Sequence, residues 1–308
     1  MQTKEIVHAG WERNLQLLND KAELIISLDV GPRILSYKTP RTENVLKNFP
    51  EQLGKAGENE WMMRGGHRLW VAPEDEGRTY VPDNVPVTYE ETAPNAVRLV
   101  NSGVDPWKIK KEMTVSLADG SPEVTIVHRI TNEGPAPVEA ASWGLSVMIP
   151  GGLEIIPLPP LGVHPRDLLP NRVMIAWPYT NLTDPRWRFG ETFITLRQTA
   201  NAGQPTKLGL AHKQKWVGYL TRDSLFIKTI EYQEGAAYPD FGCNFETFTN
   251  QEMLEIESLS PLKKLAPGES VSHTEKWHLF GEIPQPHSLQ EQELASWLAP
   301  FLQQAGLQ

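Results

Sequence analysis

Short alternations of apolar and polar residues recur along most of the chain, and each predicts a β-strand. In residues 22–28, Leu24, Ile26 and Leu28 fall on one face, and a Gly-Pro pair leads into a second run at residues 34–37, as in a hairpin. Similar runs cover residues 85–91, 96–101, 107–117, 123–132, 138–149, 192–197, 216–221, 225–231, 244–250, 253–259 and 271–280. Antiparallel strands with one apolar face predict two stacked sheets or a barrel.

A helical pattern is confined to the C-terminus. Ser288 and Glu291 have the spacing of a capping box, and Pro300 lies within the helical pattern that follows. The apolar stripe of this pattern is Leu294, Trp297, Leu298, Phe301 and Leu302. Because proline removes a helical hydrogen bond, we expect a kink or an early end near Leu298. The sequence therefore predicts one β domain over residues 1–285, with residues 286–308 forming an amphipathic helix packed on it.

Residues 158–188 are rich in proline, arginine and tryptophan and show little strand pattern. Long irregular segments in compact domains are often functional, so we expect this one to form a rim over a cleft. Its arginines could bind a phosphate group, although pairing with surface acids is the commoner role. These arginines are Arg166, Arg172, Arg186 and Arg188.

Composition limits the possible partners. The net charge of -9, without a basic run, argues against a nucleic-acid or acidic-membrane partner. The N-terminus shows no apolar leader, and no segment has about 18 uninterrupted apolar residues, so we expect a cytoplasmic protein. The one cysteine, Cys243, excludes an internal disulfide, and we expect it to be a buried apolar residue. No motif predicts a metal or a cofactor.

One predicted strand carries two like charges on one face. Glu255 and Glu257 alternate with Leu254 and Ile256, and Glu246 lies on the run just upstream. Two interpretations stay open. The glutamates form a solvated outer face, or they line a polar cleft where one carboxyl group has a raised pKa and acts as a base.

A Gly-Gly pair precedes a second candidate strand at residues 67–73. Alternation places His67 with Leu69 and Val71, and Arg68 with Trp70 on the other face. Arginine beside tryptophan can donate hydrogen bonds to hydroxyl groups while the indole stacks on a sugar ring. The ten tryptophans of the chain allow such a platform, but large core side chains are the commoner explanation for them. As structure alone, Gly-Gly is a turn and Arg68 pairs with a surface acid.

Two further polar residues fall on apolar faces. His128 shares a face with Ile126 and Ile130, which is more typical of a hydrogen-bonded core histidine than of a catalytic one. Lys228 shares a face with Phe226. A buried lysine is costly unless it is paired, so Lys228 could orient the glutamates, although snorkelling at a sheet edge is the commoner explanation.

The order of these motifs resembles the galactose mutarotase-like superfamily. The similarity is carried by Gly65-Gly66-His67-Arg68-Leu69-Trp70-Val71-Ala72-Pro73, by His128-Arg129-Ile130-Thr131-Asn132-Glu133-Gly134, and by residues 254–257 followed by Leu265-Ala266-Pro267-Gly268-Glu269-Ser270. It looks closest to an uncharacterised branch of that superfamily. The resemblance implies an all-β fold, a β-supersandwich whose curved sheet presents a concave face to a sugar.

The resemblance also implies roles for individual residues. Glu257 matches the glutamate that removes the proton from the anomeric hydroxyl in aldose 1-epimerases, and Arg68 matches an arginine that holds sugar hydroxyls. The superfamily's acid histidine has no counterpart, because residues 141–146 contain Trp143 but no histidine. His67 and His128 are then the candidates for the acid.

The sequence therefore predicts a carbohydrate-binding protein, with three functions open. The protein is an aldose 1-epimerase, a non-catalytic sugar-binding or sensing module, or an oligosaccharide lyase or hydrolase, which the lack of a leader and of a helical catalytic domain disfavours. The predicted catalytic residues are Glu257, His67 and His128. The predicted substrate-binding residues are Arg68, Trp70, Trp143, Lys228, Glu246 and Glu255.

Overall fold

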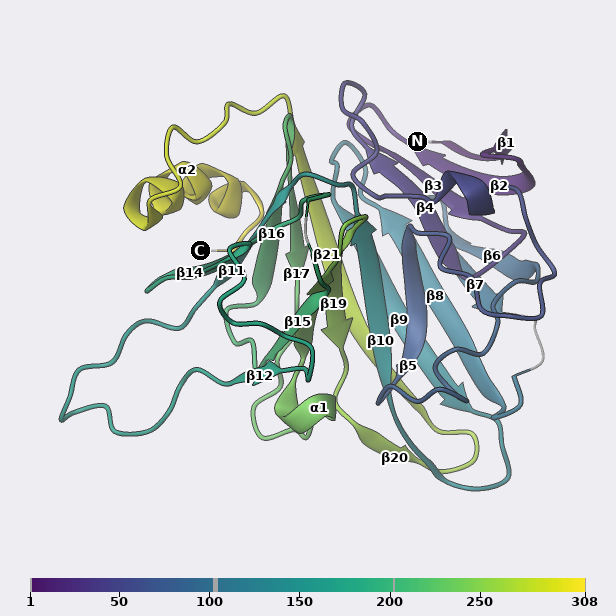
Figure 1. The fold of residues 1–308 in the computed structure, drawn as a ribbon. Helices are drawn as coiled ribbons and strands as arrows, with labels where there is room; N and C mark the ends of the chain where they lie inside the picture. The colour runs from purple at the N-terminus through teal and green to yellow at the C-terminus, as the bar shows by residue number, and fades with distance from the viewer. Residues whose placement is uncertain (1, 102–104, 202, 308) are drawn as a thin grey trace.

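Two large antiparallel sheets stack face to face, and a helix follows them at the C-terminus (Figure 1). The computed structural model describes residues 2–101, 105–201 and 203–307. Within these ranges, the first sheet has 11 strands and the second has 10. The all-β prediction and the terminal helix are therefore confirmed.

The first sheet runs in the order β1 (Gln2–His8), β2 (Trp11–Leu18), β3 (Glu23–Ser27), β4 (Arg33–Lys38), β5 (His67–Ala72), β10 (Val138–Met148), β19 (Leu254–Leu259), β18 (Phe245–Thr249), β15 (Thr206–Leu210) and β12 (Met174–Ala176), with β20 (Lys263–Leu265) paired to β10. The second runs β13 (Trp187–Phe189), β14 (Phe193–Arg197), β11 (Leu153–Pro157), β16 (Trp216–Leu220), β17 (Ser224–Thr229), β21 (Ser270–Gly281), β9 (Val124–Asn132), β8 (Ile109–Leu117), β7 (Ala96–Asn101) and β6 (Val87–Ala93). The helical elements are η1 (Pro50–Gln52), α1 (Pro239–Gly242) and α2 (Glu291–Gln304).

The core fills the space between the sheets. Leu24 and Ile26 of β3, Val71 of β5, and Ile126 and Ile130 of β9 are fully buried members of one apolar cluster. Burying one such side chain stabilises the fold by about 1.5–3 kcal/mol. Alternation along each strand thus points one face inward and leaves the other face of the first sheet free to form a site.

Helix α2 packs on the outer face of the second sheet. Leu294 and Leu298 are buried there against Phe193, Trp216 and Leu225. Of the predicted kink or early end near Leu298, the early end is wrong, because α2 continues through Pro300 to Gln304. Beyond the proline, Phe301 contacts the rings of Phe280 and Trp297, and we attribute the continuation to this packing.

The predicted capping box of α2 does not form. Gln290 occupies the N-cap position without a side-chain hydrogen bond. The carboxylate of Glu291 instead accepts hydrogen bonds from the backbone N–H groups of Glu191, Thr192 and Phe193. The first turn of the helix is thereby tied to the start of β14 rather than to its own backbone.

The irregular segment predicted at residues 158–188 contains only the short strands β12 and β13, and its first half projects from the sheets as a long loop (Figure 1). Its arginines have local partners. Arg166 pairs with Asp167 at 2.8 Å and Arg186 with Asp184 at 2.7 Å. Arg172 and Arg188 donate to backbone carbonyl groups nearby. Each of the four arginines therefore already has a partner within the protein.

None of the helices in the described ranges is both long enough and apolar enough to cross a bilayer. Cys243 is buried and unpaired, and its thiol donates a hydrogen bond to the carbonyl oxygen of Asp240.

Buried His212, in the loop after β15, predicts a measurable dependence of stability on pH. Its Nε2 lies 2.9 Å from the carbonyl oxygen of Trp216, and burial lowers its pKa from 6.5 to about 4. Between these values the unfolded chain binds a proton that the folded chain does not, so this contribution to stability is complete above pH 6.5 and is lost as the pH falls towards 4. Between pH 6 and 5, wild-type protein should lose about 1.2 kcal/mol more than His212→Gln. Urea unfolding measures both slopes, and equal slopes would contradict the assignment.

Candidate functional site

A cleft of about 340 Å³ opens on the face of the first sheet that points away from the second sheet. Strands β5, β10, β15, β18 and β19 form its floor, and loops form its rim. Its lining residues are Trp61, Met63, Arg68, Trp70, Glu74, Tyr80, Trp143, Leu145, Tyr179, Lys207, Phe248, Asn250, Met253, Glu255 and Glu257. Four of the predicted substrate-binding residues and the predicted base therefore meet in one place.

The Gly-Gly turn before β5 delivers Arg68 to this floor. Gly65 and Gly66 have φ values of +88° and +71°, which favour glycine. A Cβ atom on Gly65 would lie 2.1 Å from the carbonyl oxygen of Lys47, and one on Gly66 2.2 Å from that of Ile34. The pair is thus required for close backbone packing, and the strand that follows it places Arg68 in the cleft.

Strand register aligns the polar residues of the floor. Arg68 of β5 lies opposite Leu145 of β10, Leu145 lies opposite Glu257 of β19, and Glu257 lies opposite Glu246 of β18. All four side chains therefore point to the same face of the sheet. Glu246 is fully buried beneath the cleft rather than on its surface.

Aromatic rings form one wall of the cleft. Trp61, Trp70 and Tyr80 contact one another with ring centroids 4.9–5.5 Å apart, and Trp70 also contacts Trp143 at 5.3 Å. Residues 61 and 80 come from loops, so the wall combines two strand tryptophans with two loop residues. Such a surface can stack on the apolar face of a sugar ring.

Arg68 combines an ion pair with free hydrogen-bond donors. Its Nη1 lies 2.8 Å from Oε1 of Glu255, and its guanidinium carbon lies 4.2 Å from the centre of the Trp70 ring. Among the described residues, none accepts a hydrogen bond from Nε or Nη2, although the side chain is buried. Because unpaired buried donors are costly, these groups are suited to binding the hydroxyl groups of a ligand.

One carboxylate in the floor and one beneath it surround a single ammonium group. Nζ of Lys207 lies 2.7 Å from Oε2 of Glu246 and 3.2 Å from Oε2 of Glu257. The indole N–H of Trp143 donates a second hydrogen bond to the same Glu257 oxygen at 3.0 Å. Burial raises the pKa of Glu257, Lys207 opposes this rise, and the nearby carboxylate of Glu255 adds to it. Burial also raises the pKa of Glu246.

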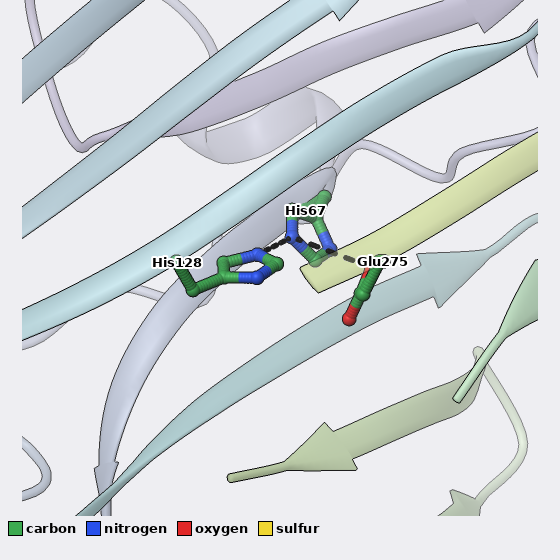
Figure 2. A group of neighbouring side chains, drawn as sticks. All are labelled: His67, His128 and Glu275. Carbon is green, nitrogen blue, oxygen red and sulfur yellow. Dashed lines mark hydrogen bonds and ion pairs between the residues drawn. The ribbon is translucent and has the colours of Figure 1, made fainter. Parts of the chain in front are cut away.

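The other predicted residues lie on the opposite side of the first sheet, in the space between the sheets. His67 and His128 are fully buried there, with their Nε2 atoms 2.7 Å apart (Figure 2). Nζ of Lys228 lies 2.7 Å from Oε1 of Glu275 and donates to the carbonyl oxygen of Ile256 at 3.0 Å. None of these residues lines the cleft, so the structure does not bring the two histidines together with Glu257.

His67, His128 and Glu275 are close enough to resemble a metal site, since their ligand atoms lie within 4.8 Å of one another (Figure 2). The neighbouring ammonium group of Lys228 already neutralises Glu275. A divalent cation there would add two positive charges beside a third in a fully buried site. This trio therefore fits a structural hydrogen-bond network better than a metal centre.

A second, larger cavity of about 500 Å³ lies near the ends of β17 and β19. It is lined by His273, but both ring nitrogens of His273 already face hydroxyl groups, those of Ser258 and Ser142. No guanidinium or indole group is among its lining residues. Its chemistry is therefore less suited to a sugar than that of the first cleft.

Sequence reasoning did not find Lys207, Trp61, Tyr80 or Tyr179. Lys207 lies next to Leu208 in a five-residue strand that was not predicted. In the sequence it is therefore indistinguishable from an ordinary solvated lysine. Trp61, Tyr80 and Tyr179 come from loops without periodicity. The high number of tryptophans was the one sequence signal for an aromatic wall, and it does not indicate which rings contact one another.

Neither any protein-family model nor any curated protein matches the sequence. Solved structures do match the fold. A galactose mutarotase-like protein from Lactobacillus casei aligns over 87% of this chain and 100% of its own, with 11% identity and a TM-score of 0.54. A second such protein, from Clostridium acetobutylicum, aligns over 91% and 98%, with 10% identity and a TM-score of 0.51. The chain has the galactose mutarotase-like fold.

A TPR-domain-containing protein from Parabacteroides distasonis also aligns with this chain, with a TM-score of 0.60 and 16% identity. The alignment covers 90% of this chain but 48% of that protein, so the chain spans about half its length. The expected β-supersandwich is thus confirmed. In this galactose mutarotase-like fold, β5, β10, β15, β18 and β19 line the floor of the cleft.

Proposed function

We propose that the protein binds a sugar in the cleft and interconverts its anomers as an aldose 1-epimerase. The observation that carries the proposal is the position of Glu257. This carboxyl group is 1% exposed and has a raised pKa, yet it forms part of the floor of a cleft lined by indole rings and a guanidinium group. A carboxylate whose pKa is raised towards neutrality is suited to act as a general base.

Binding and orientation follow from the groups around that carboxyl. One face of a sugar ring stacks on Trp70 or Trp143, while the free donors of Arg68 bind hydroxyl groups at the ring edge. Trp143 also donates to Glu257 and holds the carboxylate in place. The anomeric hydroxyl then lies within hydrogen-bond reach of Glu257.

The reaction needs one base and one acid. Glu257 removes the proton from the anomeric hydroxyl as the bond between C1 and the ring oxygen breaks and the ring oxygen takes up a proton. Rotation about the C1–C2 bond presents the other face of the carbonyl carbon, and the reverse proton transfers close the ring to the other anomer. Positioned acids and bases contribute about 10²–10⁴-fold each to such proton transfers.

The charges of the cleft favour a sugar without a phosphate group. Glu74, Glu255 and Glu257 line it, and its two cations are already paired, Arg68 with Glu255 and Lys207 with Glu257. The arginines of the irregular segment do not line the cleft. A phosphate group would therefore meet an excess of negative charge.

A non-catalytic sugar-binding module is the second candidate. The observation that favours it is the composition of the cleft, since no histidine is among the residues that line it. Sugar binding without any acceleration of anomer exchange would establish this alternative.

Binding should depend on Arg68. In a screen of aldoses by tryptophan fluorescence and calorimetry, we expect at least one to bind wild-type protein. We expect the double variant Arg68→Met with Glu255→Gln to raise the Kd of that aldose about tenfold or more, because hydrogen bonds from a charged donor are lost. The second substitution removes the carboxylate that would otherwise be left without its partner.

The control exchanges an exposed pair with the same chemistry. Arg98→Met with Glu90→Gln removes an ion pair of 2.8 Å between β7 and β6, strands that do not line the cleft, and should leave the Kd unchanged. The 6-phosphate of the same aldose should bind more weakly than the aldose itself. Tighter binding of the phosphate, or an unchanged Kd in the Arg68 variant, would contradict the proposed binding mode.

A further inference from the structure

We propose that Lys207 is the acid that protonates the ring oxygen in place of the missing histidine. The inference rests on the proposed anomer exchange and deepens it, because it assigns the second proton transfer to a residue that no motif in the sequence singled out. It is built from contacts that place one ammonium group beside the candidate base.

The position of Lys207 suits this role. It lies on β15, lines the cleft, and places Nζ 3.2 Å from the carboxylate of Glu257. The anomeric oxygen and the ring oxygen are both bonded to C1, so the base and the acid must be close neighbours. A ligand that presents its anomeric hydroxyl to Glu257 thus presents its ring oxygen near Lys207.

The side chain of Lys207 is held in place from several sides. Nζ lies 4.8 Å from the ring centre of Trp143 and 4.6 Å from that of Trp177, as in cation–π contacts. Glu246 fixes it from below at 2.7 Å, and the residue is only 4% exposed. A lysine that merely covered the surface would not be enclosed by two indole rings and two carboxylates.

The charges around Lys207 couple its proton to that of Glu257. Burial alone would lower the pKa of Lys207, but the carboxylates of Glu257 and Glu246 outweigh it and raise this pKa. When Glu257 takes the anomeric proton, it loses its negative charge, and one of the two carboxylates that raise the pKa of Lys207 is neutralised. The ammonium group therefore becomes more acidic at the moment when the ring oxygen needs a proton.

Both protons are accounted for. During ring opening, Glu257 receives the proton of the anomeric hydroxyl, the C1–oxygen bond breaks, and Lys207 gives one proton to the former ring oxygen. During closure, that hydroxyl attacks C1 and returns its proton to Lys207, while Glu257 returns its proton to the anomeric oxygen. The protein ends in its starting state without a cofactor or an external acid.

Two tyrosines in the cleft are less suitable acids. The hydroxyl group of Tyr80 already donates its proton to Glu74. Tyr179 lies on the rim, and burial raises its pKa to about 12. Its pKa does not depend mainly on the charge of Glu257, so protonation of the base would not release its proton in the same way.

The test separates exchange from binding. In wild-type protein and Lys207→Met, anomer exchange is measured by NMR exchange spectroscopy and aldose binding by calorimetry. We expect Lys207→Met to lose exchange by about 100-fold or more while its Kd changes by less than about tenfold. Lys213→Met, which removes an exposed lysine paired with Glu234, should retain wild-type exchange.

A second variant distinguishes an acid from a structural support. Methylammonium added to Lys207→Ala should restore part of the exchange rate, and the restored rate should rise with its concentration. If wild-type protein exchanges anomers and Lys207→Met does so equally fast, the inference fails while the proposed function stands. Equal losses of binding and exchange without rescue would overturn it in favour of a positioning role. If wild-type protein accelerates no aldose, both proposals fail.

Discussion

Glu257→Gln should lose anomer exchange by about 10²–10⁴-fold while retaining most of its affinity for the sugar. Glutamine has the size of glutamate and can still accept the hydrogen bond from Trp143, but it cannot take a proton from the anomeric hydroxyl. The change therefore removes the base and leaves the shape of the floor. NMR exchange spectroscopy gives the rate, and calorimetry gives the Kd on the same samples.

Glu154→Gln is the matched control for this experiment. Glu154 is a fully buried glutamate of β11 whose pKa is raised well above 4.5 by burial, and it accepts a hydrogen bond from Thr247. It lies outside the cleft, so its amide should leave exchange at the wild-type rate. An unchanged rate in Glu257→Gln would refute the assignment of the base, whatever the sugar.

Lys228→Met should destabilise the fold by about 3–5 kcal/mol, because it leaves the carboxylate of Glu275 without its counter-ion in the core. Both side chains are fully buried, and their charged atoms lie 2.7 Å apart. Burial would raise the pKa of Glu275, but Lys228 and the neighbouring histidines hold it well below its usual range. The free energy of unfolding in urea measures the loss.

Two comparisons test the explanation of that loss. Lys213→Met removes an exposed ion pair and should leave the free energy of unfolding close to the wild-type value. Adding Glu275→Gln to Lys228→Met removes the unpaired charge while keeping an acceptor for the indole N–H of Trp277, so the double variant should be more stable than the sum of the single effects predicts. Strict additivity would show that the two groups do not interact.

Much of the fold could be predicted because the alternation of apolar and polar residues shows directly which side chains share a face of a sheet. The runs that became β3, β9 and β21 are regular enough to be read without a structure. Strand β11 was missed because all five of its residues are buried, so no alternation marks it. The C-terminal helix was predicted correctly in kind, but packing around Phe301 carries it past Pro300.

The site was only partly predictable. Alternation places His67 and Arg68 on opposite faces of the strand. Leu69 and Val71 share a face with His67, and their apolar side chains already indicated that this face points into the core. Assigning both residues to one site therefore went against the pattern. Lys207 could not be predicted, because its partners Glu246 and Glu257 lie on other strands and only sheet order brings them together.

The two faces of strand β19 have different chemical roles. Glu255 and Glu257 face the cleft, while the carbonyl oxygen of Ile256 between them accepts a hydrogen bond from buried Lys228. The floor is therefore anchored from behind, whereas Trp61, Tyr80 and Tyr179 reach the rim from loops. Ligand preference can then be redesigned by exchanging rim residues, because their replacement leaves the anchored chemistry of the floor in place.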